Sequence, residues 1–196
     1  MTQLDLFDHG AQVLLDDASG RIVLTPAVVA PALAARWFES LRDEVSWKEG
    51  SRLMYEREVD VPRLRAHYRM DDAGLPQVLR DALVAVNTVI EAPFDSIGLN
   101  LYRDHRDSVA LHNDKLDDLQ RGQPIALLSL GVTRRMTIRA KQPPKRVLHV
   151  DLDAGSVLSM SWETQRHYDH AIPKQREFSE PRISLAFRVR RRPGSP

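Results

Sequence analysis

The chain has 196 residues, of which 42% are hydrophobic and 28% are charged, and its formal net charge is +1. This length fits one large domain better than two small ones. The chain contains no cysteine, which excludes disulfides, thiolate metal sites and cysteine nucleophiles. No apolar run approaches the roughly 20 residues that cross a bilayer, and the acidic start MTQLDLFDHG lacks a secretory signal. We therefore expect a cytoplasmic protein with no membrane partner.

Charge is spread unevenly along the chain. Residues 1–50 contain eight acidic and four basic residues, so this part carries −4 and the remainder +5. The segment RRMTIRAKQPPKR (134–146) holds six basic residues and no acidic one. Such a patch can bind phosphate groups. The alternative interpretation is a solvated pair of strands with a charged turn.

The first half of the chain predicts a loosely ordered start followed by helices. Residues 1–20 are polar and acidic, and we expect them to be loosely ordered. RIVLTPAVV (21–29) predicts a short strand and a turn. PALAARWFESLRDEV (31–45) predicts an amphipathic helix, because proline stands near its start and apolar residues recur every four positions. A second helix is expected over 76–92, where Pro93 stops it.

After Pro93 the hydrophobic period changes from 3.6 to 2, which indicates strands. Gly, Pro and Asp residues separate the candidates. The expected strands cover 96–102, 125–131, 135–140, 146–152, 156–162 and 182–190. Helices followed by many short strands predict an α+β protein with a β-sandwich or jelly-roll core. We expect one domain over residues 21–196.

The strand RISLAFR indicates what the interior of this sandwich contains. Residues two apart share a strand face, so Arg182, Ser184 and Arg188 lie together and the apolar residues lie on the other face. We expect the two helices to cover the apolar face, while the polar face points into the sandwich. Asn100 and Tyr102 alternate in the same way in LNLY. Polar groups inside a sandwich need polar partners, and we infer an anionic one.

The motif LHNDK places His112 and Asp114 two residues apart, so both can bind one ion from the same side of a strand. His170, in YDHAIPK, lies 58 residues further on and is expected to begin a turn. Two histidines and a carboxylate form the facial triad of non-haem Fe(II) oxygenases, which leaves positions open for a 2-oxo acid and dioxygen. An HxD pair alone is weak evidence. It gains weight from Arg182 and Arg188, because arginines bind carboxylates through paired hydrogen bonds.

A second ligand set competes in RHYDH, where His167, Asp169 and His170 stand close together. In an extended segment, His167 and Asp169 face away from His170. We therefore interpret His167 as a surface or supporting residue, and Asp169 as a partner for an arginine or for His170.

From about residue 60 to 190, the order of motifs resembles AlkB-like 2-oxoglutarate- and Fe(II)-dependent dioxygenases. The matching stretches are LNLYRDHRDSVALHNDK, IALLSLG with TRRMTIR, GSVLSMSWETQRHYDHAIPK and PRISLAFR. The resemblance implies a double-stranded β-helix (jelly-roll) core over 96–190, with the N-terminal helices packed on its outer face. It implies His112, Asp114 and His170 as iron ligands. The residues that it implies around 2-oxoglutarate are Asn100, Tyr102, Arg182, Ser184 and Arg188, with Arg182 on the distal carboxylate and Arg188 nearer the metal.

The resemblance also implies a reaction. Fe(II), 2-oxoglutarate and O2 together hydroxylate a substrate C–H bond, with succinate and CO2 as products. A methyl group on a base nitrogen then leaves as formaldehyde, which amounts to oxidative dealkylation of alkylated DNA, or less favourably RNA. Two alternatives stay open: a hydroxylase or demethylase of a protein or small molecule, and a non-catalytic nucleic-acid-binding module. No obligate protein partner is indicated.

Substrate contacts are expected from residues 51–75, where nucleic-acid-acting members of that family carry recognition hairpins. A flipped base needs flat or aromatic side chains, and the phosphate backbone needs cations. The candidate substrate-binding residues are Met54, Tyr55, Arg63, Arg65, His67, Tyr68, Leu116 and Arg135. For the two tyrosines, a core position in a hairpin is the alternative. Leu116 and Trp162 stand where the family often has an acidic residue and a glycine, so the substrate is less well defined than the iron site.

Overall fold

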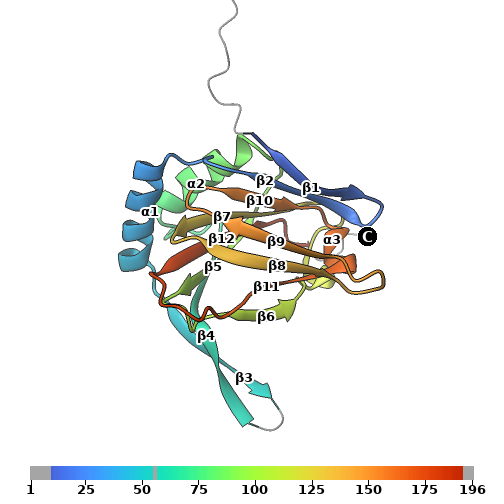
Figure 1. Cartoon of the computed structure of the whole chain (residues 1–196). Helices are drawn as coiled ribbons and strands as arrows, with labels where there is room; N and C mark the ends of the chain where they lie inside the picture. The colour runs from blue at the N-terminus through green and yellow to red at the C-terminus, as the bar shows by residue number, and fades with distance from the viewer. Residues whose placement is uncertain (1–9, 55–56, 192–196) are drawn as a thin grey trace, which may run out of the picture.

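The protein is built mostly from antiparallel β-sheet, with few helices (Figure 1). A computed structural model describes residues 10–54 and 57–191, with the backbone alone for 51–54 and 57–61. The first half contains β1 (Gln12–Asp17), β2 (Gly20–Thr25), α1 (Pro31–Glu44), β3 (Lys48–Met54), β4 (Arg57–Arg69), α2 (Gln77–Asn87) and β5 (Ser96–Tyr102). The second half contains β6 (Val109–His112), η1 (Leu116–Asp118), β7 (Ile125–Gly131), β8 (Arg134–Ala140), β9 (Val147–Leu152), β10 (Val157–Met160), α3 (Thr164–His167), β11 (Tyr168–Ile172) and β12 (Arg182–Arg188).

The described strands form two sheets. The larger has eight strands in the order β1-β2-β10-β7-β12-β5-β4-β3, and the smaller has four in the order β6-β11-β8-β9. A shared buried cluster joins the sheets, with Tyr102, Leu127 and Leu158 from the larger and Ile138 and Leu152 from the smaller. Two sheets packed over a common core fit the expected jelly-roll architecture.

Helices α1 and α2 take part in a second buried cluster, on the other face of the larger sheet. Helix α1 begins at Pro31, which has no N–H to leave unpaired in the first turn, and it buries Trp37 and Leu41. Helix α2 buries Leu79 and Val86. The residues of β12 in this cluster are Ile183, Leu185 and Phe187. Removal of this apolar surface from water, at roughly 25 cal/mol per Å², holds the helices on the sheet.

Strand β12 has the two faces that its alternation predicts. Its apolar residues face the helices, whereas Arg182 and Ser184 are buried on the inner face and Ala186 joins the cluster between the sheets. The strand pairs with β5 on one side and β7 on the other. The polar residues of β12 therefore lie at the centre of the sandwich.

The beginning of the chain differs from the prediction. Strand β1 covers residues 12–17, where the sequence predicted loose order, and it pairs antiparallel with β2. That part of the prediction is wrong, because Leu15 is buried in the cluster between the sheets and fixes the strand. Residues 1–9 lie outside the described residues.

The end of helix α2 and the local structure at His170 also differ from the predictions. Helix α2 ends at Asn87 rather than near residue 92, where the Thr88 hydroxyl donates to the Ala85 carbonyl and satisfies a terminal helix acceptor. His170 lies within β11 rather than at the start of a turn, because this strand pairs with β6 on one side and β8 on the other.

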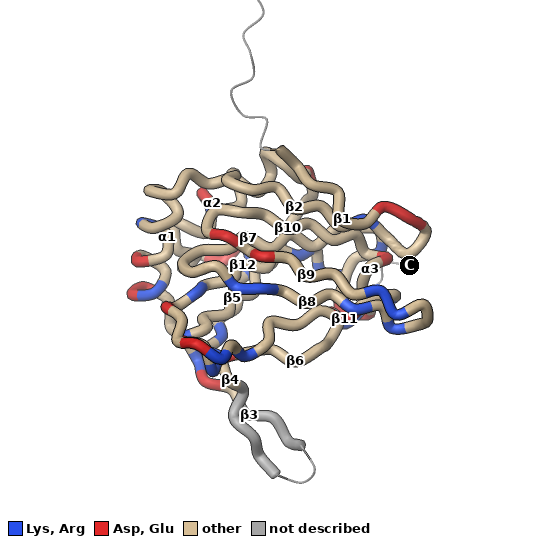
Figure 2. The backbone as a smooth tube through the Cα atoms, viewed as in Figure 1, with Lys and Arg blue, Asp and Glu red and all other residues tan. Residues whose placement is uncertain are grey.

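Several of the basic residues of the segment 134–146 lie together in the structure. Figure 2 shows basic residues gathered at the turn between β8 and β9, where Lys141, Lys145 and Arg146 lie. Strands β3 and β4 pair as a hairpin at one edge of the larger sheet (Figure 1). Among the described residues, no helix has both the length and the hydropathy needed to cross a membrane.

Candidate active site

Two histidines meet across the small sheet. His112 ends β6, and it is the direct register partner of His170 in β11. The centroids of the two imidazole rings are 4.5 Å apart. His170 is buried, and burial together with the charge of His112 lowers its pKa to about 3. A neutral imidazole at neutral pH is the form that binds a metal ion.

Asp114 follows β6 by two residues and is held by an arginine. Its carboxylate accepts hydrogen bonds from Arg188 Nε at 2.7 Å and Nη2 at 3.1 Å. Its backbone N–H donates to Gln165 Oε1 at 3.0 Å. Burial raises the pKa of Asp114, but the Arg188 charge and hydrogen bonds outweigh burial, so the pKa lies below its ordinary value. The carboxylate is therefore ionised and oriented before any ligand binds.

His112, Asp114 and His170, the three predicted iron ligands, are thus neighbours, although their side chains are not arranged as a metal-binding cluster. Across the described part of the chain, no three His, Asp or Glu side chains are gathered tightly enough to hold a metal ion. The two imidazole charges nevertheless act on Asp114, which places its carboxylate in their field. Both carboxylate oxygens of Asp114 accept hydrogen bonds from Arg188, so the arginine sets the orientation of this carboxylate beside the two imidazoles.

A buried arginine lies deeper in the sandwich. Arg182 is fully buried, and its Nη2 donates to Ser129 Oγ at 2.8 Å. The Arg182 guanidinium carbon lies 5.4 Å from the centre of the Tyr102 ring. Burial lowers the pKa of Arg182 to about 10. Its Nε and Nη1 have no hydrogen-bond partner within the described residues, which is costly for a buried cation unless an anion reaches them.

A second buried arginine, Arg134, was not singled out from the sequence. Its guanidinium carbon lies 5.6 Å from the Tyr102 ring centre. It donates to three backbone carbonyls, those of Asp104 at 3.1 Å, Asp107 at 3.0 Å and Pro173 at 2.8 Å. The alternation of RRMTIRA carries the missing signal, since Arg134 shares its strand face with the buried residues Met136 and Ile138.

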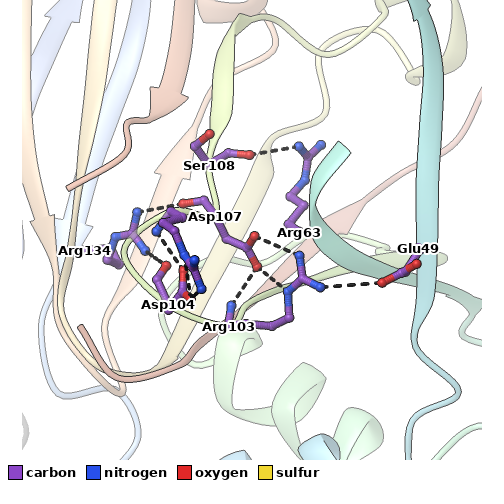
Figure 3. A network of polar contacts seen from close by, with 8 residues as sticks. Glu49, Arg63, Arg103, Asp104, Asp107, Ser108 and Arg134 are labelled. Atoms are coloured by element: carbon purple, nitrogen blue, oxygen red, sulfur yellow. Dashed lines mark hydrogen bonds and ion pairs between the residues drawn. The ribbon is translucent and has the colours of Figure 1, made fainter. Parts of the chain in front are cut away.

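Arg134 holds the loop between β5 and β6 in place by hydrogen bonds to two of its backbone carbonyls (Figure 3). In this loop the Asp107 carboxylate accepts from Arg103 Nε at 2.8 Å and Nη2 at 3.0 Å. Arg103 also reaches Glu49 at 3.6 Å, and Arg63 donates to the Ser108 carbonyl at 3.3 Å. The network joins the β3–β4 hairpin to the loop that leads into β6, and so it positions the strand that carries His112.

A large cavity of about 870 Å³ opens between β4, β5 and the segment 112–119. The predicted residues on its wall are His112, Asp114, Arg188, Asn100, Arg63, Arg65, His67 and Tyr68. Arg63 Nε donates to Asn100 Oδ1 at 2.7 Å. Tyr68 also packs against the cluster under the helices. Burial and the charges of Arg190 and Arg188 lower the pKa of His67.

The other predicted residues lie elsewhere. Ser184 is buried and pairs in register with Asn100. Arg135 is exposed and forms an ion pair with Asp151. Leu116 lines a smaller, adjoining hollow. Met54 and Tyr55 lie outside the residues whose side chains the structure describes. Asp169 faces away from the imidazoles and lies 3.8 Å from Lys141.

Comparison with known proteins identifies relatives. The family described as 2OG-Fe(II) oxygenase superfamily matches residues 21–188. The alpha-ketoglutarate-dependent dioxygenase alkB homolog 3 of Bos taurus is 33% identical over 188 residues, covering 86% of this chain and 66% of that protein. The DNA oxidative demethylase ALKBH2 of Homo sapiens is 29% identical over 175 residues, covering 77% of this chain and 66% of that protein. The chain thus spans about two thirds of the length of these curated relatives.

A solved structure supports the fold. The structure titled "The structure of OsALKBH1" superposes with a TM-score of 0.61, covering 91% of this chain and all of that one, at 16% sequence identity. At this identity the likeness speaks for the fold. It agrees with the two facing antiparallel sheets described above.

The family description pairs Fe(II) with 2-oxoglutarate, and the residues present fit both groups. Imidazole nitrogens and a carboxylate are the donor set of Fe(II) oxygenases, and His112, His170 and Asp114 supply them beside the large cavity. The unpartnered N–H groups of Arg182 suit a carboxylate.

Proposed function

Because the chain belongs to the 2OG-Fe(II) oxygenase superfamily, we propose that it dealkylates N-alkylated bases in nucleic acid, with DNA favoured over RNA. The observation that carries this proposal is the register pairing of His112 with His170, with His112 and Asp114 on the wall of a basic cavity. Two relatives support the reaction class by their names, an alpha-ketoglutarate-dependent dioxygenase and a DNA oxidative demethylase. We further propose one catalytic domain over residues 21–196.

We assign iron binding to His112, His170 and Asp114. The imidazole of His170 is neutral at neutral pH, so it is ready to bind without losing a proton. Asp114 brings the negative charge that offsets part of the metal's charge. Arg188 holds this carboxylate through two hydrogen bonds and would keep it oriented for a bound metal ion.

We assign 2-oxoglutarate to the inner face of β5 and β12. Arg182 would bind the distal carboxylate through its unpartnered N–H groups, and Tyr102 packs against the same guanidinium. Asn100 and Ser184 are register partners on these two strands, so both belong to the same layer of the site. With Fe(II) and O2 bound, the co-substrate supplies an oxidant that hydroxylates a C–H bond, and succinate and CO2 are released.

The large cavity suits a flipped nucleotide. Its wall carries Arg63, Arg65, Lys115 and Arg190, and these cations attract a phosphate backbone. His67 is expected to be neutral at neutral pH because its pKa is lowered, and a neutral ring can stack on a base. Hydroxylation of an N-methyl group gives an unstable carbinol, which breaks into formaldehyde and the unmodified base.

The test is a panel of methylated oligonucleotides, single- and double-stranded, carrying methyladenine or methylcytosine. We expect formaldehyde and succinate in equal amounts, both dependent on added Fe(II) and 2-oxoglutarate. His112→Ala serves as the blank, and Arg36→Gln, which alters an exposed arginine on helix α1, serves as the matched control. Succinate formation without any nucleic-acid substrate in the panel would favour a protein or small-molecule substrate instead.

A further inference from the structure

Beside the large cavity lies a second hollow that the proposed chemistry does not use. Its volume is about 350 Å³, within the roughly 300–1,000 Å³ range of small-molecule sites. The wall contains Trp162 and three arginines, Arg121, Arg166 and Arg191, against one acid, Asp117. The charge of this wall is therefore positive.

Two arginines of this wall lie against the ring of Trp162. The guanidinium carbons of Arg121 and Arg166 each lie 5.9 Å from its ring centre. Neither side chain forms an ion pair with any described residue. The indole Nε1 is buried and lacks a hydrogen-bond partner within the described chain. A buried donor without an acceptor costs free energy, and two unpaired arginines beside it point to an anionic oxygen as the missing partner.

The position of the hollow narrows the choice of anion. Leu119, directly after η1, lines both the large cavity and this hollow. Arg190 faces the large cavity and Arg191 faces the hollow. The two spaces therefore adjoin across a single segment of chain. A phosphate bound in the hollow would therefore lie next to the cavity that is proposed to hold a flipped base.

Building on the proposed nucleic-acid substrate, we propose that the hollow binds the backbone phosphate of a nucleotide next to the target base. Arg121 and Arg166 pair with the phosphate oxygens, and Trp162 Nε1 donates to the same group. The Trp162 ring orients both guanidinium groups by cation–π contact. This subsite extends the length of oligonucleotide that the protein binds to at least one nucleotide beyond the flipped base.

Binding of an unmethylated, fluorescein-labelled 12-residue oligothymidylate tests this assignment by anisotropy over a series of salt concentrations. Each phosphate contact on a single strand contributes a slope of about −0.7 to log K against log salt. We expect the double variant Arg121→Gln/Arg166→Gln to weaken binding about tenfold and to make the slope shallower by about 0.7, the value of one phosphate contact. Arg36→Gln/Arg80→Gln, two exposed arginines on the helices, is the matched control and should leave both values unchanged.

Tryptophan fluorescence gives a second readout. The chain has three tryptophans, of which Trp37 is buried under the helices. Oligonucleotide binding should change the emission of the unaltered chain, and Trp162→Phe should reduce that change, with any remainder arising from Trp47 beside the wall of the large cavity. The thermal midpoint of each variant shows that it is folded.

The outcomes separate this inference from the proposed function. Unaltered affinity and slope in the Arg121/Arg166 double variant, with salt-dependent binding by the original chain, overturn the phosphate subsite alone. An emission change of undiminished size in Trp162→Phe does the same. Absence of salt-dependent binding by the original chain overturns both the subsite and the nucleic-acid part of the proposed function.

Discussion

Arg188 grips Asp114 with two hydrogen bonds, at 2.7 and 3.1 Å, although the two residues lie 74 positions apart in the chain. Each side chain is only about 15% exposed, so their attraction is weakly screened by solvent. This pair fastens the end of β12 to the segment after β6 and sets the resting position of a predicted iron ligand.

The first prediction concerns this pair. Arg188→Gln should lower the free energy of unfolding of the metal-free protein by about 2–4 kcal/mol, because it leaves a mostly buried carboxylate without its partner. Asp114→Asn should cost a similar amount, and the double variant should cost clearly less than the sum of the two. Urea unfolding of all four proteins measures the coupling. Strict additivity would show that the pair contributes no mutual stabilisation.

The second prediction is that Arg182 serves 2-oxoglutarate binding and does not stabilise the fold. Its buried guanidinium has two unpartnered N–H positions, so Arg182→Met should leave the free energy of unfolding unchanged or raise it. The same change should weaken 2-oxoglutarate binding about 10- to 100-fold, the value of a lost charged hydrogen-bond pair. Calorimetric titration and urea unfolding measure the two effects. A loss of several kcal/mol in stability with unaltered co-substrate affinity would assign Arg182 to the core alone.

Arg134, in contrast to Arg182, should stabilise the fold. Its guanidinium donates to three backbone carbonyls, and Arg134→Met leaves them short of donors in the interior. We expect a loss of about 2–4 kcal/mol in the free energy of unfolding. Arg135→Gln, one residue away but exposed, should change stability by no more than about 0.5 kcal/mol. Equal effects of the two substitutions would contradict the anchoring role of Arg134.

The neighbouring arginines also show where sequence reasoning reached its limit. Alternation in RISLAFR and LNLY placed Arg182, Asn100 and Tyr102 on the inner face, because a strand's period of 2 requires it. The same rule applied to RRMTIRA points to Arg134. The high basic content of that segment predicts Arg135 as a substrate contact, and in the structure Arg135 is exposed and pairs with Asp151.

Other features depend on contacts between distant segments and leave no local signal. The position of His170 within β11 follows from pairing with β6 and β8 on both sides, which a segment of five residues cannot reveal alone. The grip of Arg188 on Asp114 and the approach of Arg121 to Trp162 likewise arise only when the chain folds. The spacing of His112 and Asp114 predicted a shared site, and the structure brings the rings of His112 and His170 together. The cytoplasmic location stays a prediction.

Stability of the metal-free protein should fall in mildly acidic solution. Burial depresses the pKa of His170 to about 3 in the folded state, against roughly 6.5 in an unfolded chain. Between these values the unfolded chain binds one more proton, so the free energy of unfolding declines as pH falls below about 6.5, by up to about 1.4 kcal/mol per pH unit. Above pH 7 this contribution is constant.

The check is urea unfolding of the chelator-treated protein at pH 7 and pH 5, beside the variant His170→Gln. The glutamine cannot titrate in this range, so the variant should show a shallower pH dependence. An identical pH dependence in both proteins would mean that His170 does not carry the effect.

The central claim is that His112, His170 and Asp114 meet on one ferrous ion, with 2-oxoglutarate reaching Arg182. The most direct measurement is a crystal structure of the full chain grown without oxygen with Fe(II) and 2-oxoglutarate, with iron located by its anomalous scattering. We predict one iron peak bonded to both imidazoles and to the Asp114 carboxylate, and a co-substrate carboxylate on Arg182. Iron bound elsewhere, or at this place without Asp114 and with no anion at Arg182, would contradict the account.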